Sequence, residues 1–168
     1  MQVYKNFIDQ VKADDLEAIM MSEEFPWFFG IMSTKEDMNP ELNVLDNKHF
    51  THTFYNYYRF QSNFSDILTP IILKINPVSI LRIKANLTTR KNKIIEHGMH
   101  TDFVQPNLKI HTGIFYVNTT DGYTKFEDDT IVEGVKNTFV EFDSKTKHTG
   151  SSCTDKSGRI VINFNYVK

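Results

Sequence analysis

The feature that most constrains this chain is a succession of short apolar segments, rich in β-branched and aromatic residues, that begins at Val78. Six such segments cover residues 78–88, 110–117, 123–126, 130–135, 138–142 and 159–167, and their composition is typical of β-strands. The links between them carry turn-forming residues, and none shows a helix-length apolar period. Because parallel neighbours would need crossover helices, this order predicts antiparallel pairing. We therefore expect a mainly β fold, an all-β sandwich or jelly roll.

The N-terminal part has a different pattern and predicts supporting helices. Apolar residues recur at helical spacing from Phe7 to Met20, which predicts an amphipathic helix. Asn63 or Ser65 could cap a second helix that runs towards Asn76. Residues 51–60 favour a strand, and the polar stretch 33–43 is typical of a surface loop. We expect one domain over residues 1–168, with mixed helical support in 1–76 and the β core in 78–168.

Charge and cysteine content limit the partners and the compartment. The formal net charge of -2 provides no global positive field, so nucleic acid is a less expected partner and no membrane partner is expected. The single cysteine, Cys153, cannot form an intramolecular disulfide. Acidic residues interrupt the first twenty positions, so no signal peptide is indicated. We expect a cytoplasmic protein.

His100-Thr101-Asp102 places two metal-ligating side chains two positions apart. On an extended segment, side chains at positions i and i+2 project to the same face and could grip one ion. His148 is the best third ligand for a two-histidine, one-carboxylate iron site. Taken without its surroundings, His148 would instead be interpreted as a surface histidine beside two lysines. Arg159 begins an apolar segment, where a buried guanidinium needs an anion to pair with.

Residues 82–166 carry these groups within an ordered series of motifs. The series comprises His100-Thr101-Asp102, Phe115-Tyr116-Val117-Asn118, Gly122-Tyr123-Thr124-Lys125-Phe126, His148-Thr149-Gly150 and Arg159. In order and spacing it resembles the Fe(II)/2-oxoglutarate-dependent oxygenases, and among them the prolyl 4-hydroxylase-like branch. The resemblance implies a double-stranded β-helix, a jelly roll whose mouth holds the iron, with supporting helices at the N-terminus.

The resemblance also implies cofactors, roles and a reaction. His100, Asp102 and His148 would bind Fe(II), and Arg159 would hold the far carboxylate of 2-oxoglutarate. Tyr116 would by default be a core aromatic on a strand, but a buried tyrosine hydroxyl needs a partner, which the 2-oxoglutarate carboxylate could supply. The co-substrates implied are 2-oxoglutarate and O2, with ascorbate as an optional addition. The reaction implied is hydroxylation of a substrate C–H bond with release of succinate and CO2. The substrate implied is a peptide or protein, with peptidyl proline first, or a small molecule.

Two departures from the family pattern and two rival interpretations remain. Many prolyl hydroxylases carry a tyrosine before the His-x-Asp motif that helps to bind 2-oxoglutarate, whereas this chain has Asn86 to take that role. Asn137 replaces a glycine and tolerates a left-handed turn nearly as well. The rivals are a non-catalytic jelly-roll binding or structural module and another cupin-type metal enzyme. The intact ligand set and Arg159 favour the oxygenase.

Other polar residues near the motif have plainer interpretations. His97 is expected to be solvated or a substrate contact, and His111 to be a half-buried structural residue. His49 and His52 are assigned no chemistry. A basic run before the motif is expected to form a solvated lid, although it could also face an acidic or nucleic-acid substrate. The run comprises Arg82, Lys84, Arg90, Lys91 and Lys93.

Overall fold

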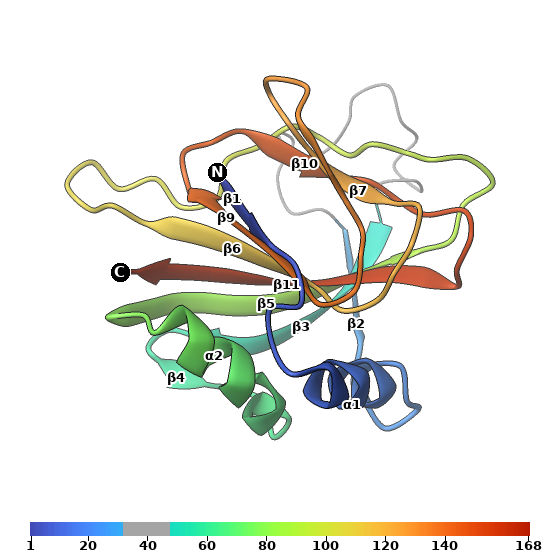
Figure 1. Ribbon diagram of the computed structural model, residues 1–168, viewed down its shortest axis with the longest axis horizontal. Helices are drawn as coiled ribbons and strands as arrows, with labels where there is room; N and C mark the ends of the chain where they lie inside the picture. The colour runs from blue at the N-terminus through green and yellow to red at the C-terminus, as the bar shows by residue number, and fades with distance from the viewer. Residues whose placement is uncertain (32–47) are drawn as a thin grey trace.

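Two antiparallel sheets and two α-helices make up the part of the chain that the computed structural model describes, residues 1–31 and 48–168 (Figure 1). The expected surface loop at 33–43 lies outside the described residues. The larger sheet has the order β1 (Gln2–Tyr4), β9 (Thr138–Asp143), β6 (His111–Tyr116), β11 (Gly158–Val167), β5 (Ser79–Thr89), β3 (Lys48–Asn56) and β2 (Phe28–Ile31), with β4 (Arg59–Phe60) paired to β3. The smaller sheet has the order β10 (His148–Gly150), β7 (Tyr123–Phe126) and β8 (Ile131–Glu133). The predicted jelly roll, a double-stranded β-helix, is confirmed.

The first helix, α1 (Gln10–Met20), confirms the helix expected near the N-terminus. It begins after Asp9, whose carboxylate accepts the backbone N–H groups of Val11 and Lys12 and so satisfies donors that lack a partner within the helix. Its buried face consists of Ala13, Leu16 and Met20. None of the helices that the structure describes is both long and apolar enough to cross a membrane.

The second helix, α2 (Thr69–Ile75), starts differently from the prediction. A 3-10 turn, Ser65–Leu68, precedes it, and neither segment has a side-chain cap, so the expected capping by Asn63 or Ser65 is wrong. The Ser65 hydroxyl instead donates to the carbonyl of Ser62, a local bond that competes with capping. The helix ends at Asn76 in a left-handed conformation, as its sequence suggested.

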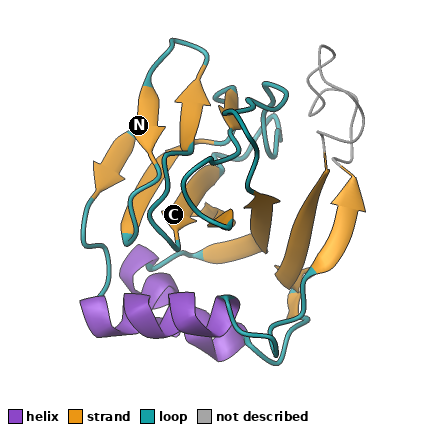
Figure 2. Cartoon of the chain, turned by 90° about the vertical axis from the view of Figure 1, so that its right-hand side faces the viewer, coloured by secondary structure: helices purple, strands orange, loops and turns teal. Residues whose placement is uncertain are grey.

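The larger sheet separates two hydrophobic clusters. One cluster lies between the helices and the larger sheet, and the other includes side chains of β6, β9 and β11 from the larger sheet and of β7 and β8 from the smaller one. Figure 2 shows the helices together on one side of the strands. Along β11, Ile160 and Ile162 belong to the helix-side cluster and Val161 to the other, because successive side chains of a strand point to opposite faces. Arg159 and Asn163 share the face of Val161, and all three line a cavity on that side.

Residues with left-handed backbone conformations differ from one expectation and agree with another. The strand expected at 51–60 is interrupted by Tyr57 and Tyr58, whose φ angles of 50° and 62° form a hairpin turn. Left-handed tyrosines are uncommon, so the sequence carried no turn signal there. Asn137 has a φ of 59°, which confirms the left-handed position expected for it. Its side chain also bonds both backbone polar groups of Ile8 and so ties the N-terminal segment to β9.

Candidate metal centre

A cavity of about 440 Å³ contains the groups that the sequence pointed to. Its walls come from β3, β5, β6 and β11 of the larger sheet, β7 and β10 of the smaller sheet, and the segment 97–103. His100, Asp102, His148, Arg159 and Asn86 all line it. Of the described residues expected to form the site, Tyr116 alone lies behind the lining. The fold therefore brings together groups that are far apart in the sequence.

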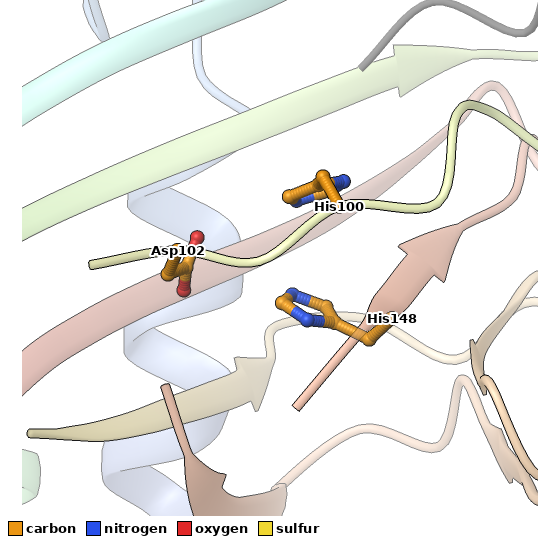
Figure 3. A group of neighbouring side chains, drawn as sticks. All are labelled: His100, Asp102 and His148. Carbon is orange, nitrogen blue, oxygen red and sulfur yellow. The ribbon is translucent and has the colours of Figure 1, made fainter. Parts of the chain in front are cut away.

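His100 and His148 are placed by a pair of backbone hydrogen bonds. The N–H of His100 donates to the carbonyl of His148 at 3.0 Å, and the N–H of His148 donates back at 2.9 Å. Asp102 follows in a bend anchored by its N–H on the carbonyl of Ser144 at 3.2 Å. As Figure 3 shows, the three side chains turn towards one another. Each side chain offers one ligand atom, and these three atoms lie within 4.8 Å of one another. A two-histidine, one-carboxylate set of this kind suits ferrous iron with open positions.

Backbone carbonyls orient both imidazole rings. Nδ1 of His100 lies 3.0 Å from the carbonyl oxygen of Gly98, and Nδ1 of His148 lies 3.1 Å from that of Thr146. A carbonyl can only accept, so each Nδ1 carries the proton and each Nε2 keeps a lone pair. This arrangement prepares both Nε2 atoms to bind a metal.

Asp102 is held by a closed set of polar neighbours. Its Oδ2 accepts the Thr112 hydroxyl at 2.8 Å and the Asn165 amide at 2.9 Å. Arg82 lies 3.5 Å from Oδ1 and also donates to the side-chain oxygen of Asn165 at 3.1 Å. Burial alone would raise the pKa of Asp102, but His148, Arg82 and the two hydrogen bonds outweigh it and hold the pKa below its usual value. The carboxylate is therefore ionised at neutral pH, with Oδ1 less engaged than Oδ2.

Thr112, Asn165 and Arg82 were missed as partners of Asp102 in the sequence analysis. A signal for two of them was present, because Thr112 and Asn165 interrupt otherwise apolar strands and both are fully buried. A buried polar side chain requires a hydrogen-bond partner. The sequence could thus have marked these two positions, although not which group they serve.

Thr112→Val is expected to lower the affinity for Fe(II) about tenfold, since partners of metal ligands typically contribute 10- to 100-fold. The substitution removes the hydroxyl that holds Oδ2 of Asp102 and keeps a branched side chain. Anaerobic Fe(II) titration measures the effect. Thr112→Ser is the matched control, because it keeps the hydroxyl and should bind Fe(II) nearly as well as the wild type. Wild-type affinity in a folded Thr112→Val protein would contradict the role given to this bond.

Arg159 is a buried cation that lacks an anion among the residues that the structure describes. Its side chain is 4% exposed, and Nη2 donates to the Thr124 hydroxyl oxygen at 3.0 Å. Its Nε has no hydrogen-bond partner, and no carboxylate within 1–31 and 48–168 pairs with its guanidinium. Burial lowers the pKa of Arg159, with Tyr116 opposing the shift, yet an arginine remains protonated in proteins. Such a site is complementary to an anion.

The Gly-x-Thr-x-Phe hairpin supports this arginine. A Cβ atom at Gly122 would lie 2.5 Å from the carbonyl oxygen of Ser152 and 2.7 Å from Cδ of Arg159, so glycine is required there. Thr124 accepts hydrogen bonds from Arg159 and, at 2.7 Å, from the Tyr116 hydroxyl. Tyr116 therefore contacts Thr124 and places its ring 5.5 Å from the guanidinium carbon. With Thr124 as the acceptor in both bonds, its own hydroxyl hydrogen is available for a further acceptor.

The structure also places the other histidines and the basic residues near the motif, and most of them differ from the expectation. His97 is buried in the cavity wall, so of its two expected roles the solvated one is wrong, and the role of substrate contact stays a prediction. His49, which was assigned no chemistry, also lines the cavity. His111 is structural, as expected, with its Nδ1 2.9 Å from Glu141. Two members of the basic run, Arg82 and Lys84, lie on β5 in the cavity wall and so do not form a solvated lid.

Comparison with known proteins rests on structure alone, since neither a protein-family model nor a curated protein matches the sequence. A prolyl hydroxylase from Trichoplax adhaerens, solved in complex with a hypoxia inducible factor oxygen degradation domain peptide fragment, aligns with a TM-score of 0.67 and 8% identity over 99% of this chain and 82% of its own. A prolyl-4-hydroxylase from Pseudomonas putida aligns with a TM-score of 0.63 and 12% identity over 99% and 92%. The epimerase SnoN, in complex with Fe3+, alpha ketoglutarate and nogalamycin RO, aligns with a TM-score of 0.69 and 9% identity over 99% and 78%. The chain thus has the fold of the prolyl hydroxylases and of other 2-oxoglutarate, Fe(II) oxygenases.

Proposed function

We propose that this chain is an Fe(II)- and 2-oxoglutarate-dependent dioxygenase in which His100, Asp102 and His148 hold the iron and Arg159 binds the co-substrate. One observation carries the proposal. The same cavity holds a two-histidine, one-carboxylate set within 4.8 Å and a buried arginine that lacks an anion. The first group fits ferrous iron, and the second fits the far carboxylate of 2-oxoglutarate.

Charge balance supports this combination of groups. The charges of Fe(II) and Arg159 are cancelled by those of Asp102 and of 2-oxoglutarate with its two carboxylates. A neutral assembly can be buried at a smaller desolvation cost than either Arg159 without an anion or the metal ion alone. Neither rival function explains the buried arginine. A non-catalytic jelly-roll module has no ligand that would pair with Arg159, and a cupin-type enzyme that binds only a metal would leave Arg159 without an anion.

When bound, Fe(II), 2-oxoglutarate and O2 together supply an oxidation that hydroxylates a substrate C–H bond and yields succinate and CO2. The residues of the chain position the participants. Arg159, held by Thr124 and packed on Tyr116, fixes one end of the co-substrate. The Asp102 network fixes the carboxylate ligand. Asn86, on β5 opposite Val161, is a further contact for 2-oxoglutarate or substrate in the cavity wall.

We propose that residues 1–168 form one oxygenase domain that acts on a peptidyl residue, proline first. Strands β1, β2 and β3 from the N-terminal part pair into the same sheet as β5, β6, β9 and β11, which supports the single domain. The solved complex of a Trichoplax prolyl hydroxylase with a peptide supports a peptide substrate. The complex of SnoN with Fe3+ and alpha ketoglutarate supports the choice of cofactors.

An anaerobic titration with Fe(II) and 2-oxoglutarate tests the proposal. We expect the visible charge-transfer absorption of an iron–2-oxo acid chelate to appear only when both are present. After admission of O2, proline-rich peptides, single-stranded oligonucleotides and free amino acids are compared for succinate release and for a mass gain of about 16 Da. Fe(II) binding without the absorption band would contradict the co-substrate. A mass gain only with oligonucleotides or amino acids would overturn the peptide substrate and leave the cofactors standing.

A further inference from the structure

His97 lies beside Arg159 in the wall of the cavity. The backbone N–H of His97 donates to the carbonyl of Gly150 at 3.1 Å, so the two residues are adjacent across the cavity wall. A Cβ atom at Gly150 would lie only 3.3 Å from Nη1 of Arg159. His97 and Arg159 therefore flank the same glycine, and both side chains line the cavity.

The imidazole of His97 is buried without hydrogen bonds. It is 8% exposed, and neither Nδ1 nor Nε2 has a partner among residues 1–31 and 48–168. His52, also buried, differs in that its two ring nitrogens lie 2.8 and 2.7 Å from oxygen atoms. Since buried polar groups normally have partners, a cavity-lining residue whose two ring nitrogens are both unbonded is an exception that a ligand in the cavity could account for.

The His97 ring offers a donor without adding charge. Burial, followed by electrostatic repulsion from His49, Arg159, Lys91 and His100, lowers the pKa of His97 to about 4. At neutral pH the ring is therefore uncharged, with one N–H donor and one acceptor. A bond from this N–H to an anion would leave unchanged the charge balance of Fe(II), Asp102, 2-oxoglutarate and Arg159.

We propose that His97 donates its ring N–H to the far carboxylate of 2-oxoglutarate, and that it thereby favours dicarboxylate over monocarboxylate 2-oxo acids. This inference rests on the proposed function. Three residues with donor groups line this cavity from separate parts of the chain and would face the anion together: Arg159 from β11, Thr124 from β7, and His97 from the loop before His100. A carboxylate can accept all three, because its two oxygens offer about four lone-pair sites.

Affinities of the Fe(II)-loaded protein for two 2-oxo acids test this role under anaerobic conditions. 2-Oxoglutarate has the far carboxylate and 2-oxobutyrate lacks it. In His97→Phe, which keeps a planar ring and removes both nitrogens, we expect the Kd for 2-oxoglutarate to rise about tenfold and that for 2-oxobutyrate to stay unchanged. His97→Gln keeps an N–H donor and should lie between His97→Phe and wild type. His111→Phe is the matched control, because His111 lies outside the cavity lining and should leave both affinities unchanged.

The Kd values of His97→Phe and Arg159→Leu for 2-oxoglutarate separate the role of His97 from the proposed co-substrate. If His97→Phe keeps the wild-type Kd for 2-oxoglutarate while Arg159→Leu raises it, the role of His97 is overturned and the co-substrate stands. If neither variant changes that Kd, both are overturned. An equal loss for both oxo acids in His97→Phe would also overturn the role, since His97 would then act at the chelating end. Should the phenylalanine variant not fold, His97→Leu carries the same comparison.

Discussion

Replacement of His100, Asp102 or His148 by alanine is expected to abolish Fe(II)-dependent turnover. Each variant should also lower the affinity for Fe(II) by more than about 100-fold, beyond the range found for outer partners of metal ligands. The reason is that one of three protein ligands is lost, and the remaining two cannot hold iron in a geometry open to co-substrate. Fe(II) titration and succinate release with the same preparation measure the two effects.

Folding should survive these three substitutions. The three proposed ligands line the cavity and belong to neither hydrophobic cluster, so thermal unfolding should stay close to that of the wild type. Asp15→Ala is the matched control, because this carboxylate is exposed on α1, far in sequence and fold from the cavity. A His148→Ala protein with wild-type iron affinity and turnover would show that the third ligand is wrongly assigned.

Arg159→Leu is expected to raise the Kd for 2-oxoglutarate by at least about 30-fold. Removing one partner of a buried, hydrogen-bonded charge pair costs about 2 kcal/mol or more, which corresponds to that factor. Fe(II) affinity should stay close to wild type, because Arg159 bonds Thr124 and is not one of the three proposed ligands. Anaerobic isothermal titration measures both constants, with Fe(II) added to the metal-free protein for the first and 2-oxoglutarate added to the Fe(II)-loaded protein for the second.

The Arg159→Lys variant separates the contribution of the positive charge to 2-oxoglutarate binding from that of the guanidinium geometry. Arg159→Lys keeps the positive charge and loses the planar fork that matches a carboxylate, so it should restore part of the affinity. A leucine variant with unchanged 2-oxoglutarate affinity would remove the main support for this co-substrate. A lysine variant equal to wild type would mean that charge alone, without the fork, accounts for binding.

The strands of the β core could be placed from the sequence with small errors at their ends. The segment expected at 123–126 is β7, and that expected at 159–167 differs from β11 by one residue. Alternation of apolar and polar residues is a local property, so it can be read without knowledge of the partner strand. The three-residue strand β10 was missed, because a segment so short carries no period.

Residue chemistry and motif order were also sufficient to nominate the groups of the site. His100, Asp102, His148 and Arg159 were selected because metal ligands and a buried cation are recognisable by type and spacing. Their proximity could not follow from the sequence alone. It depends on the antiparallel pairing of His100 with His148, which joins a loop to a strand too short to be foreseen.

The mainly β fold, most of the strands and the identity of the ligand candidates follow from local composition and order, and could therefore be predicted from the sequence. The surroundings of those candidates depend on how the strands pair in three dimensions. Asn165 on β11 pairs in register with Thr112 on β6 and with Arg82 on β5, and this lateral pairing brings three polar side chains onto Asp102. Burial of His97 and the lack of an anion beside Arg159 among the described residues arise in the same way. Strand register joins residues that are distant in sequence, so a local pattern cannot specify such contacts.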